Sequence, residues 1–129
     1  MTRTSDQSVE SATAFVTKLP FGSTIAIQTT VEDKPTFWLA SKQSEVKVSG
    51  TTNPNTGVTR GEKILSIIWY DRISDYKYIK LDDITHVSVS SVIVTTSKIA
   101  WQRTTTNRYY LGEHTHSLIQ NLVNKLSEL

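Results

Sequence analysis

The sequence predicts a mainly β fold: a small bent antiparallel sheet or barrel with one C-terminal α-helix. Most of the chain consists of short segments that alternate apolar and polar residues and are rich in Val, Ile and Thr, which is typical of strands. The last segment repeats its apolar residues at the helical period instead. The 129 residues fit one domain whose core needs no cross-link, and the chain has no cysteine.

The chain begins with a polar stretch, residues 1–12, which shows no apolar periodicity and which we expect to be a disordered lead-in. A single domain then covers residues 13–129. Its first strand, residues 22–31, places Ile25 and Ile27 on one face. Further strand segments follow, of which the last two form a hairpin: residues 36–48, 62–70, 76–81, 86–95, 98–103 and 107–111.

The strand over residues 62–70 is apolar on both faces, which predicts a central position with both faces covered. A long polar loop, residues 49–61, precedes it. Asp82 and Asp83 interrupt the alternation of a later segment and predict a turn. The Ser90–Ser91 step shifts the alternation by one residue, which a β-bulge would explain.

The C-terminal helix is predicted over residues 117–128. Ser117 is a suitable N-cap, and Gln120 three residues later completes a capping box. The helix carries one apolar stripe: Leu118, Ile119, Leu122, Val123, Leu126 and Leu129. Such a stripe predicts that the helix packs on the sheet and contributes to the core.

Composition limits the function classes. The net charge of +2 and the pI of about 8.9 are mildly basic, which is compatible with nucleic-acid binding without indicating it. No apolar run approaches the ~20 residues that span a bilayer, and the N-terminus lacks the apolar core of a signal peptide, so we expect a nuclear or cytosolic protein. The absence of cysteine excludes a thiolate metal site and a cysteine nucleophile.

Three segments carry a resemblance to a known fold family. Gly22-Ser-Thr-Ile-Ala-Ile is followed by Phe37-Trp38-Leu39-Ala40 and then by Ile64 to Tyr70, which ends in Trp69-Tyr70. This order of strands and aromatic residues resembles the SH3-like reader barrels, that is, the BAH, Tudor and chromo-barrel domains, over residues 22–94. The resemblance implies an SH3-like β-barrel and a recognition role in chromatin.

Reader barrels hold a methylated ammonium among two to four aromatic rings, because ring faces attract a cation. The candidates for such a site are the aromatic residues near strand ends, with one acidic neighbour: Trp38, Tyr70, Asp75, Tyr76 and Tyr78. A turn after residue 70 would bring Tyr70 beside a tyrosine of the next strand. Alternation assigns Trp69 to the core and Tyr70 to the surface, where Asp75 can offset the ammonium charge. The alternative is that the rings fill the core.

The predicted function is a non-catalytic recognition module that binds a protein segment, such as a methylated, histone-like tail. One alternative is nucleic-acid binding by the C-terminal hairpin, where Arg103 and Arg108 would contact phosphates and Tyr109 would stack on a base. Another is a homo-oligomeric assembly module that uses the apolar helix or a sheet edge. The sequence leaves a monomer and a homodimer equally open.

The remaining polar clusters predict no catalysis and no metal site. His114 and His116, two residues apart on an expected extended segment, could share a metal, but a site needs a third ligand. Asp82 and Asp83 would point to opposite faces of a strand, which is unsuitable for an acid/base pair. The chain contains neither a Gly-rich phosphate loop nor a nucleophile elbow, so we expect no cofactor and no enzyme.

Overall fold

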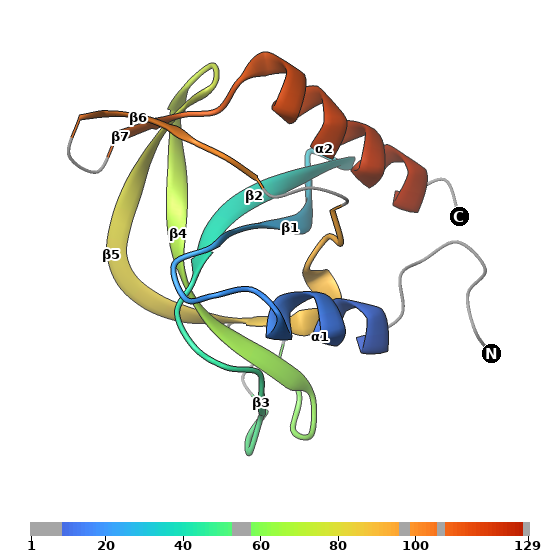
Figure 1. Cartoon of the computed structure of the whole chain (residues 1–129). Helices are drawn as coiled ribbons and strands as arrows, with labels where there is room; N and C mark the ends of the chain where they lie inside the picture. Colours follow the sequence, from blue (N-terminus) through green and yellow to red (C-terminus); the bar gives the residue numbers. More distant parts are fainter. Residues whose placement is uncertain (1–8, 53–57, 96–98, 106–107, 128–129) are drawn as a thin grey trace.

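The computed structural model describes residues 9–52, 58–95, 99–105 and 108–127. It confirms the mainly β fold with a C-terminal helix (Figure 1). The elements in chain order are α1 (Val9–Thr17), β1 (Thr24–Val31), β2 (Lys34–Lys42), β3 (Lys47–Val48), β4 (Lys63–Ser74), β5 (Lys77–Ser88), the 3₁₀ turn η1 (Val89–Ser91), β6 (Gln102–Thr105), β7 (Arg108–Tyr110) and α2 (Glu113–Ser127).

The sheet runs in the order β1-β2-β4-β5-β7-β6, and β3 pairs with the start of β4. All of these pairings are antiparallel. After β5 the chain passes through η1 and returns to β1, where Ile27 and Val92 form an isolated bridge. The Ile93 N–H also donates to the Ala26 carbonyl at 2.8 Å. The sheet is therefore bent back toward its first strand but is not closed into a barrel (Figure 1).

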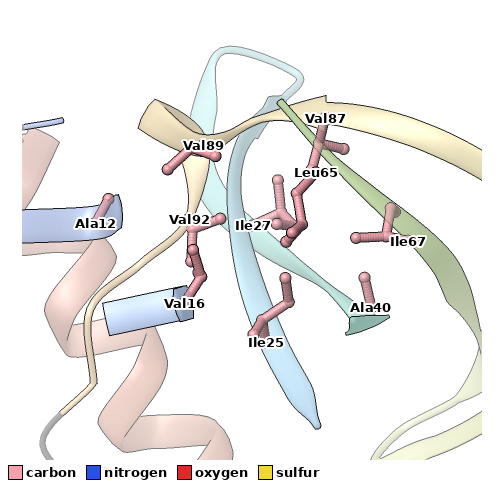
Figure 2. Packing of buried hydrophobic residues seen from close by; sticks show 10 residues of the cluster. All are labelled: Ala12, Val16, Ile25, Ile27, Ala40, Leu65, Ile67, Val87, Val89 and Val92. Atoms are coloured by element: carbon pink, nitrogen blue, oxygen red, sulfur yellow. The ribbon is translucent and has the colours of Figure 1, made fainter. Parts of the chain in front are cut away.

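Alternate residues of the central strands supply two separate cores, because successive side chains point to opposite faces of a sheet. The α1-side core consists of Ala12, Val16, Ile25, Ile27, Ala40, Leu65, Ile67, Val87, Val89 and Val92 (Figure 2). The α2-side core consists of Ala26, Phe37, Leu39, Tyr70, Tyr78, Ile93, Ile99, Leu111, Ile119 and Val123. Strand β4 contributes to both cores, as its two apolar faces predict.

Helix α1 occupies part of the expected lead-in. It starts at Val9, so residues 9–12 are helical rather than disordered, and residues 1–8 lie outside the described part of the chain. Ala12 and Val16 are one helical turn apart and are fully buried in the α1-side core. This tertiary packing, more than local propensity, accounts for so short a helix.

A buried lysine ties α1 to β2. Lys42 is 3% exposed, and its Nζ donates to the carbonyl oxygens of Val16 and Leu19 at 2.7 Å each. These carbonyls lie at and just beyond the C-terminal end of α1, where the helix dipole favours a cation. The same ammonium lies 5.5 Å from the ring centroid of Phe21.

Helix α2 begins one turn earlier than predicted. It starts at Glu113 instead of Ser117, so the predicted N-cap and capping box are wrong. Ser117 is exposed within the helix, and the side chain of Gln120 reaches Pro35 of β2, whose carbonyl accepts from Nε2 at 3.0 Å. The last predicted helical residue, 128, lies outside the described residues.

Strand β5 is continuous where the sequence predicts a turn. Asp82 and Asp83 lie inside it, at an irregular step that sets residues 81–83 against Trp69 alone. A bulge of this kind absorbs extra residues without ending the strand. At Ser90–Ser91 the predicted bulge is wrong, because these residues belong to η1.

The predicted C-terminal hairpin is present as β6 and β7, although residues 98, 106 and 107 of the prediction lie outside the described residues. Residues 53–57 of the predicted loop also lie outside the described residues. The ends of that loop are joined by the Gly61 N–H, which donates to the Ser49 carbonyl at 2.8 Å. Within the described part of the chain, neither helix is long and apolar enough to cross a membrane.

A candidate binding groove between two hairpins

The candidate site opens where β2 and β4 separate. The two strands pair over only four residues each, and their last rung is Leu39 opposite Tyr70. Beyond this rung β2 continues to Lys34 in partnership with β1, and β4 continues to Ser74 in partnership with β5. A groove therefore lies between the β1–β2 hairpin and the β4–β5 hairpin.

The groove has a volume of about 470 Å³, which falls in the usual range for ligand sites. Its wall is largely apolar and aromatic: Val31, Lys34, Thr36, Phe37, Trp38, Trp69, Tyr70, Asp71, Arg72, Tyr78 and Leu81. Three of these residues, Val31, Trp38 and Leu81, are large apolar side chains that remain exposed, and Trp38 is 50% exposed. Exposed apolar side chains that gather at one opening indicate a binding surface.

Two tryptophans stand side by side on the α1-core face of the sheet. Trp38 lies opposite Ile27 in the β1–β2 register, and Trp69 lies opposite Ala40 in the β2–β4 register. Their ring centroids are 5.6 Å apart with perpendicular planes, a favourable edge-to-face arrangement. Trp69 also packs against the α1-side core, so it fixes the position of Trp38 while half of Trp38 stays exposed.

Backbone groups of the two separating strands also face the groove. The Gln43 N–H donates to the Ser66 carbonyl at 2.9 Å, which shows that odd residues of β2 and even residues of β4 direct their N–H and C=O groups toward each other. Phe37 and Arg72 would form the next rung, but the register ends one rung earlier. The shared register of β2 and β4 therefore stops at Leu39 and Tyr70, and Phe37 itself is buried.

The charged residues of the groove wall are Lys34, Asp71 and Arg72, and further charged residues lie next to the wall in the sequence. We define the mouth as residues 31–34, 69–72 and 80–83, because each stretch contributes to the wall. It contains five carboxylates and three cations: Glu32, Asp33, Asp71, Asp82 and Asp83, with Lys34, Arg72 and Lys80. One cation is engaged, since Arg72 Nη2 lies 3.2 Å from Asp75 Oδ1 in an exposed pair. The whole chain, in contrast, carries a net charge of +2.

Two tyrosines of the predicted cage, Tyr70 and Tyr78, lie in a packed cluster of rings. Tyr70 contacts Trp101 and Tyr109, with centroid distances of 4.8 and 5.2 Å. Trp101 lies 5.1 Å from Tyr78 and 5.5 Å from Tyr109, and its Nε1–H donates to Thr24 Oγ1. Rings at these distances touch each other directly, so an ammonium group does not fit between them.

The assignment of Tyr70 to the surface is wrong. Tyr70 is 7% exposed and Tyr78 is 4% exposed, whereas Trp69 is only partly buried. The reason is that helix α2, together with Ile99, Trp101, Tyr109 and Leu111, covers the face that alternation assigns to Tyr70. Burial raises the pKa of both tyrosines above the usual value of 10.0, because it disfavours the phenolate.

The groove brings together three of the five predicted ligand-binding residues, namely Trp38, Tyr70 and Tyr78. Asp75 and Tyr76 do not line it, because they form the turn between β4 and β5. Tyr76 has a φ of 63°, a left-handed conformation that is rare for a bulky residue.

The ring of His116 bridges the two hairpins on the α2 side. It lies 5.0 Å from the Phe37 ring and 5.5 Å from the Tyr76 ring, centroid to centroid. Burial and then repulsion from Arg72 lower the pKa of His116, and attraction by Asp75 opposes this shift. His116 belongs to α2 and not to an extended segment. Among the described residues, no group of three His, Cys, Asp or Glu side chains could hold a metal ion.

The residues of the predicted nucleic-acid site lie on the β6–β7 hairpin. Arg103 is opposite Tyr109 in the register, and Arg108 is opposite Thr105. The Tyr109 ring packs against Tyr70 and is half-buried, so its contacts are with the core. Arg108 is exposed, and the side chain of Arg103 lies outside the described part of the structure.

Sequence reasoning missed Val31 and Leu81, which are exposed apolar residues of the wall. Each of these residues ends an alternating stretch of sequence, and only the pairing of the strands brings both of them to the groove. A signal for them was present, because each is followed by two carboxylates: Val31-Glu32-Asp33 and Leu81-Asp82-Asp83. An exposed apolar residue beside paired charges is the pattern of an interface rim.

Comparison with known proteins adds no relative to this geometry. The chain matches no protein-family model, no curated protein and no solved structure.

Proposed function

We propose that the chain is a recognition module that binds a segment of another protein in the groove between β2 and β4. The observation that carries this proposal is Trp38, which remains half-exposed at the mouth of an open groove while Trp69 fixes its position. Tryptophan is enriched among the residues that dominate binding energy, because a rigid, large ring gains much by leaving water.

The distribution of polar groups supports the same function. Apolar and aromatic side chains make up most of the wall, which also includes Lys34, Asp71 and Arg72. An apolar centre with a polar rim is the usual anatomy of a protein interface. For a methylated lysine, the structure favours Trp38 as the contact, because the rings of Tyr70 and Tyr78 already contact other rings.

The test is selection from a random peptide library displayed on phage, with the full chain as the target. Enriched peptides are then titrated by calorimetry against the wild-type chain and Trp38→Ala. A central aromatic residue contributes about 2 kcal/mol or more, so Trp38→Ala should weaken binding by about 30-fold. Leu118→Ala is the matched control: Leu118 is 48% exposed but lies on α2 and is not part of the groove wall, so its truncation should leave the affinity unchanged.

Two further titrations separate the ligand classes. A trimethyl-lysine peptide should compete with the selected peptides if a methylated side chain is the ligand. A labelled oligonucleotide whose binding weakens steeply with salt and requires Arg108 would favour nucleic-acid recognition instead. The proposal is refuted if no peptide is enriched, or if enriched peptides bind Trp38→Ala as tightly as the wild type.

A further inference from the structure

We infer that His116 is a pH-sensitive latch of the groove: its neutral ring holds the β1–β2 and β4–β5 hairpins together, and acid releases them and weakens ligand binding. This inference rests on the proposed function and adds to it a means of regulation. Three features carry it: the position of the ring, the attachment of α2 to both hairpins, and the conformation of Tyr76.

The His116 ring lies at the junction between the two hairpins. Its centroid is 5.0 Å from that of Phe37 in β2 and 5.5 Å from that of Tyr76 in the β4–β5 turn. Phe37 also lines the groove, which opens where the β2–β4 register stops at Leu39 and Tyr70. The imidazole therefore bridges the same gap between β2 and β4 that forms the groove, and loss of this bridge would let the gap widen.

Helix α2 is attached to one hairpin at its beginning and to the other further along (Figure 1). Just before the helix, the Leu111 N–H donates to the Tyr76 carbonyl of the β4–β5 turn at 2.8 Å. One turn after His116, Gln120 Nε2 donates to the Pro35 carbonyl of β2 at 3.0 Å. Neither bond involves a group that titrates near neutral pH. His116 lies between these two attachments in the sequence, and among the three contacts it is the one that protonation changes.

The groups around His116 disfavour its charged form. Burial lowers the pKa of His116 most, repulsion from Arg72 lowers it further, and attraction by Asp75 opposes both. The Asp75 side chain is 89% exposed and paired with Arg72 at 3.2 Å, so water and the guanidinium weaken its attraction. On α2 itself Glu113, one turn earlier, is exposed, and β2 presents the uncharged Phe37 ring. The imidazolium is therefore more stable in water, and falling pH drives the ring out of the gap.

The conformation of Tyr76 identifies the part that moves. Its φ of 63° is rare for a bulky residue, and such strain persists only where the surroundings enforce it. The rings of His116 and Tyr110 both contact the Tyr76 ring, with centroids 5.5 and 6.4 Å away. Loss of the His116 contact removes one of these supports, so the β4–β5 turn is free to relax away from β2.

The first experiment measures the gap directly, without a ligand. The chain has no cysteine, so Thr30→Cys and Ser74→Cys place one nitroxide label on each hairpin, at exposed positions outside the groove wall. Electron paramagnetic resonance should show a longer distance between the labels at about pH 5 than at about pH 8. His116→Phe and His116→Gln cannot be protonated, and their label distances should stay the same. His114→Gln and His86→Gln remove the two other histidines, which are exposed, and should respond to pH as the wild type does.

The second experiment measures the consequence for binding. Histidine-free peptides selected from the phage library should bind the wild type about fivefold or more weakly at the acidic pH, which is the usual range for coupled sites. His116→Phe keeps a ring at this position and should bind these peptides equally at both pH values. His116→Ala removes the ring and should bind them weakly throughout.

The outcomes separate the latch from the function on which it rests. If the label distance does not change with pH, or changes equally in His116→Phe and His116→Gln, the latch is wrong and the recognition function stands. If the distance changes but the affinity of the peptides does not, the regulation of binding is wrong and recognition again stands. If the phage library yields no ligand, both fail.

Discussion

The two-residue turn that joins β1 to β2 holds its backbone in an unfavourable conformation, and substitution should relieve it. Val31 and Lys34 close the hairpin, and the residues between them, Glu32 and Asp33, have φ angles of 53° and 62°. Tight hairpin turns of this kind favour Asn-Gly, because both central positions need a left-handed backbone. An L-residue loses about 1–2 kcal/mol there, although Asp loses less because its side chain can bond locally.

The magnitude for Glu32→Asn/Asp33→Gly follows from these terms. Each substitution removes part of the free-energy cost of the left-handed backbone. Glycine offsets this gain by about 0.5–1 kcal/mol, because it increases the freedom of the unfolded chain. The net stabilisation should be about 0.5–1.5 kcal/mol, which for a domain of this size raises the melting temperature by about 2–6 °C. Thermal and urea denaturation followed by circular dichroism measure it.

The control is Glu32→Gln/Asp33→Asn, which removes the same two charges but keeps side chains at both positions. It should change the melting temperature much less than the Asn-Gly variant. The reasoning about turn strain is refuted if the Asn-Gly variant melts at or below the wild-type temperature.

Three other predictions concern stability. Lys42→Met keeps the buried stem but leaves two carbonyls at the end of α1 without their donor, so it should cost about 1–3 kcal/mol in urea unfolding; equal stability would contradict this role. Since the pKa of His116 is lowered, the unfolded chain binds more protons below its usual value of 6.5, and the free energy of unfolding should fall as pH drops through that region. His116→Gln should reduce this pH dependence, measured by denaturant titrations between pH 8 and 5. Ile119→Ala should cost about 2–5 kcal/mol because Ile119 is buried, whereas Leu118→Ala, its exposed neighbour, should change stability by less than about 0.5 kcal/mol.

Local periodicity predicted the elements whose pattern is self-contained. The apolar stripe predicted α2, and the run of residues 62–70 predicted a strand covered on both faces, because those signals lie within one segment. Period two also separated Trp69 from Tyr70 correctly onto opposite faces. It could not tell which face would be covered more completely, because that depends on Trp101 and Tyr109, which return to Tyr70 from distant parts of the chain.

The sequence could not predict the groove, for a related reason. Its existence depends on how many rungs join β2 to β4, which is a property of two strands separated by a long loop. The prediction placed Trp38, Tyr70 and Tyr78 in one site, and all three do line the groove. It had no means of foreseeing that two of them form a buried wall and that only Trp38 is left substantially exposed.

The shape of the groove has its origin in irregular pairing between β4 and β5. The three residues Leu81, Asp82 and Asp83 oppose Trp69 alone, and Ile73 adds a second irregularity nearby on β4. Bulges increase the twist of the strands that carry them, so they turn the β4–β5 hairpin away from β2 just beyond the last shared rung. On the α2 side the separation is bridged by the His116 ring, which touches Phe37 of one hairpin and the turn of the other. The residues that interrupt the apolar alternation of β5 thus contribute to the opening of the groove.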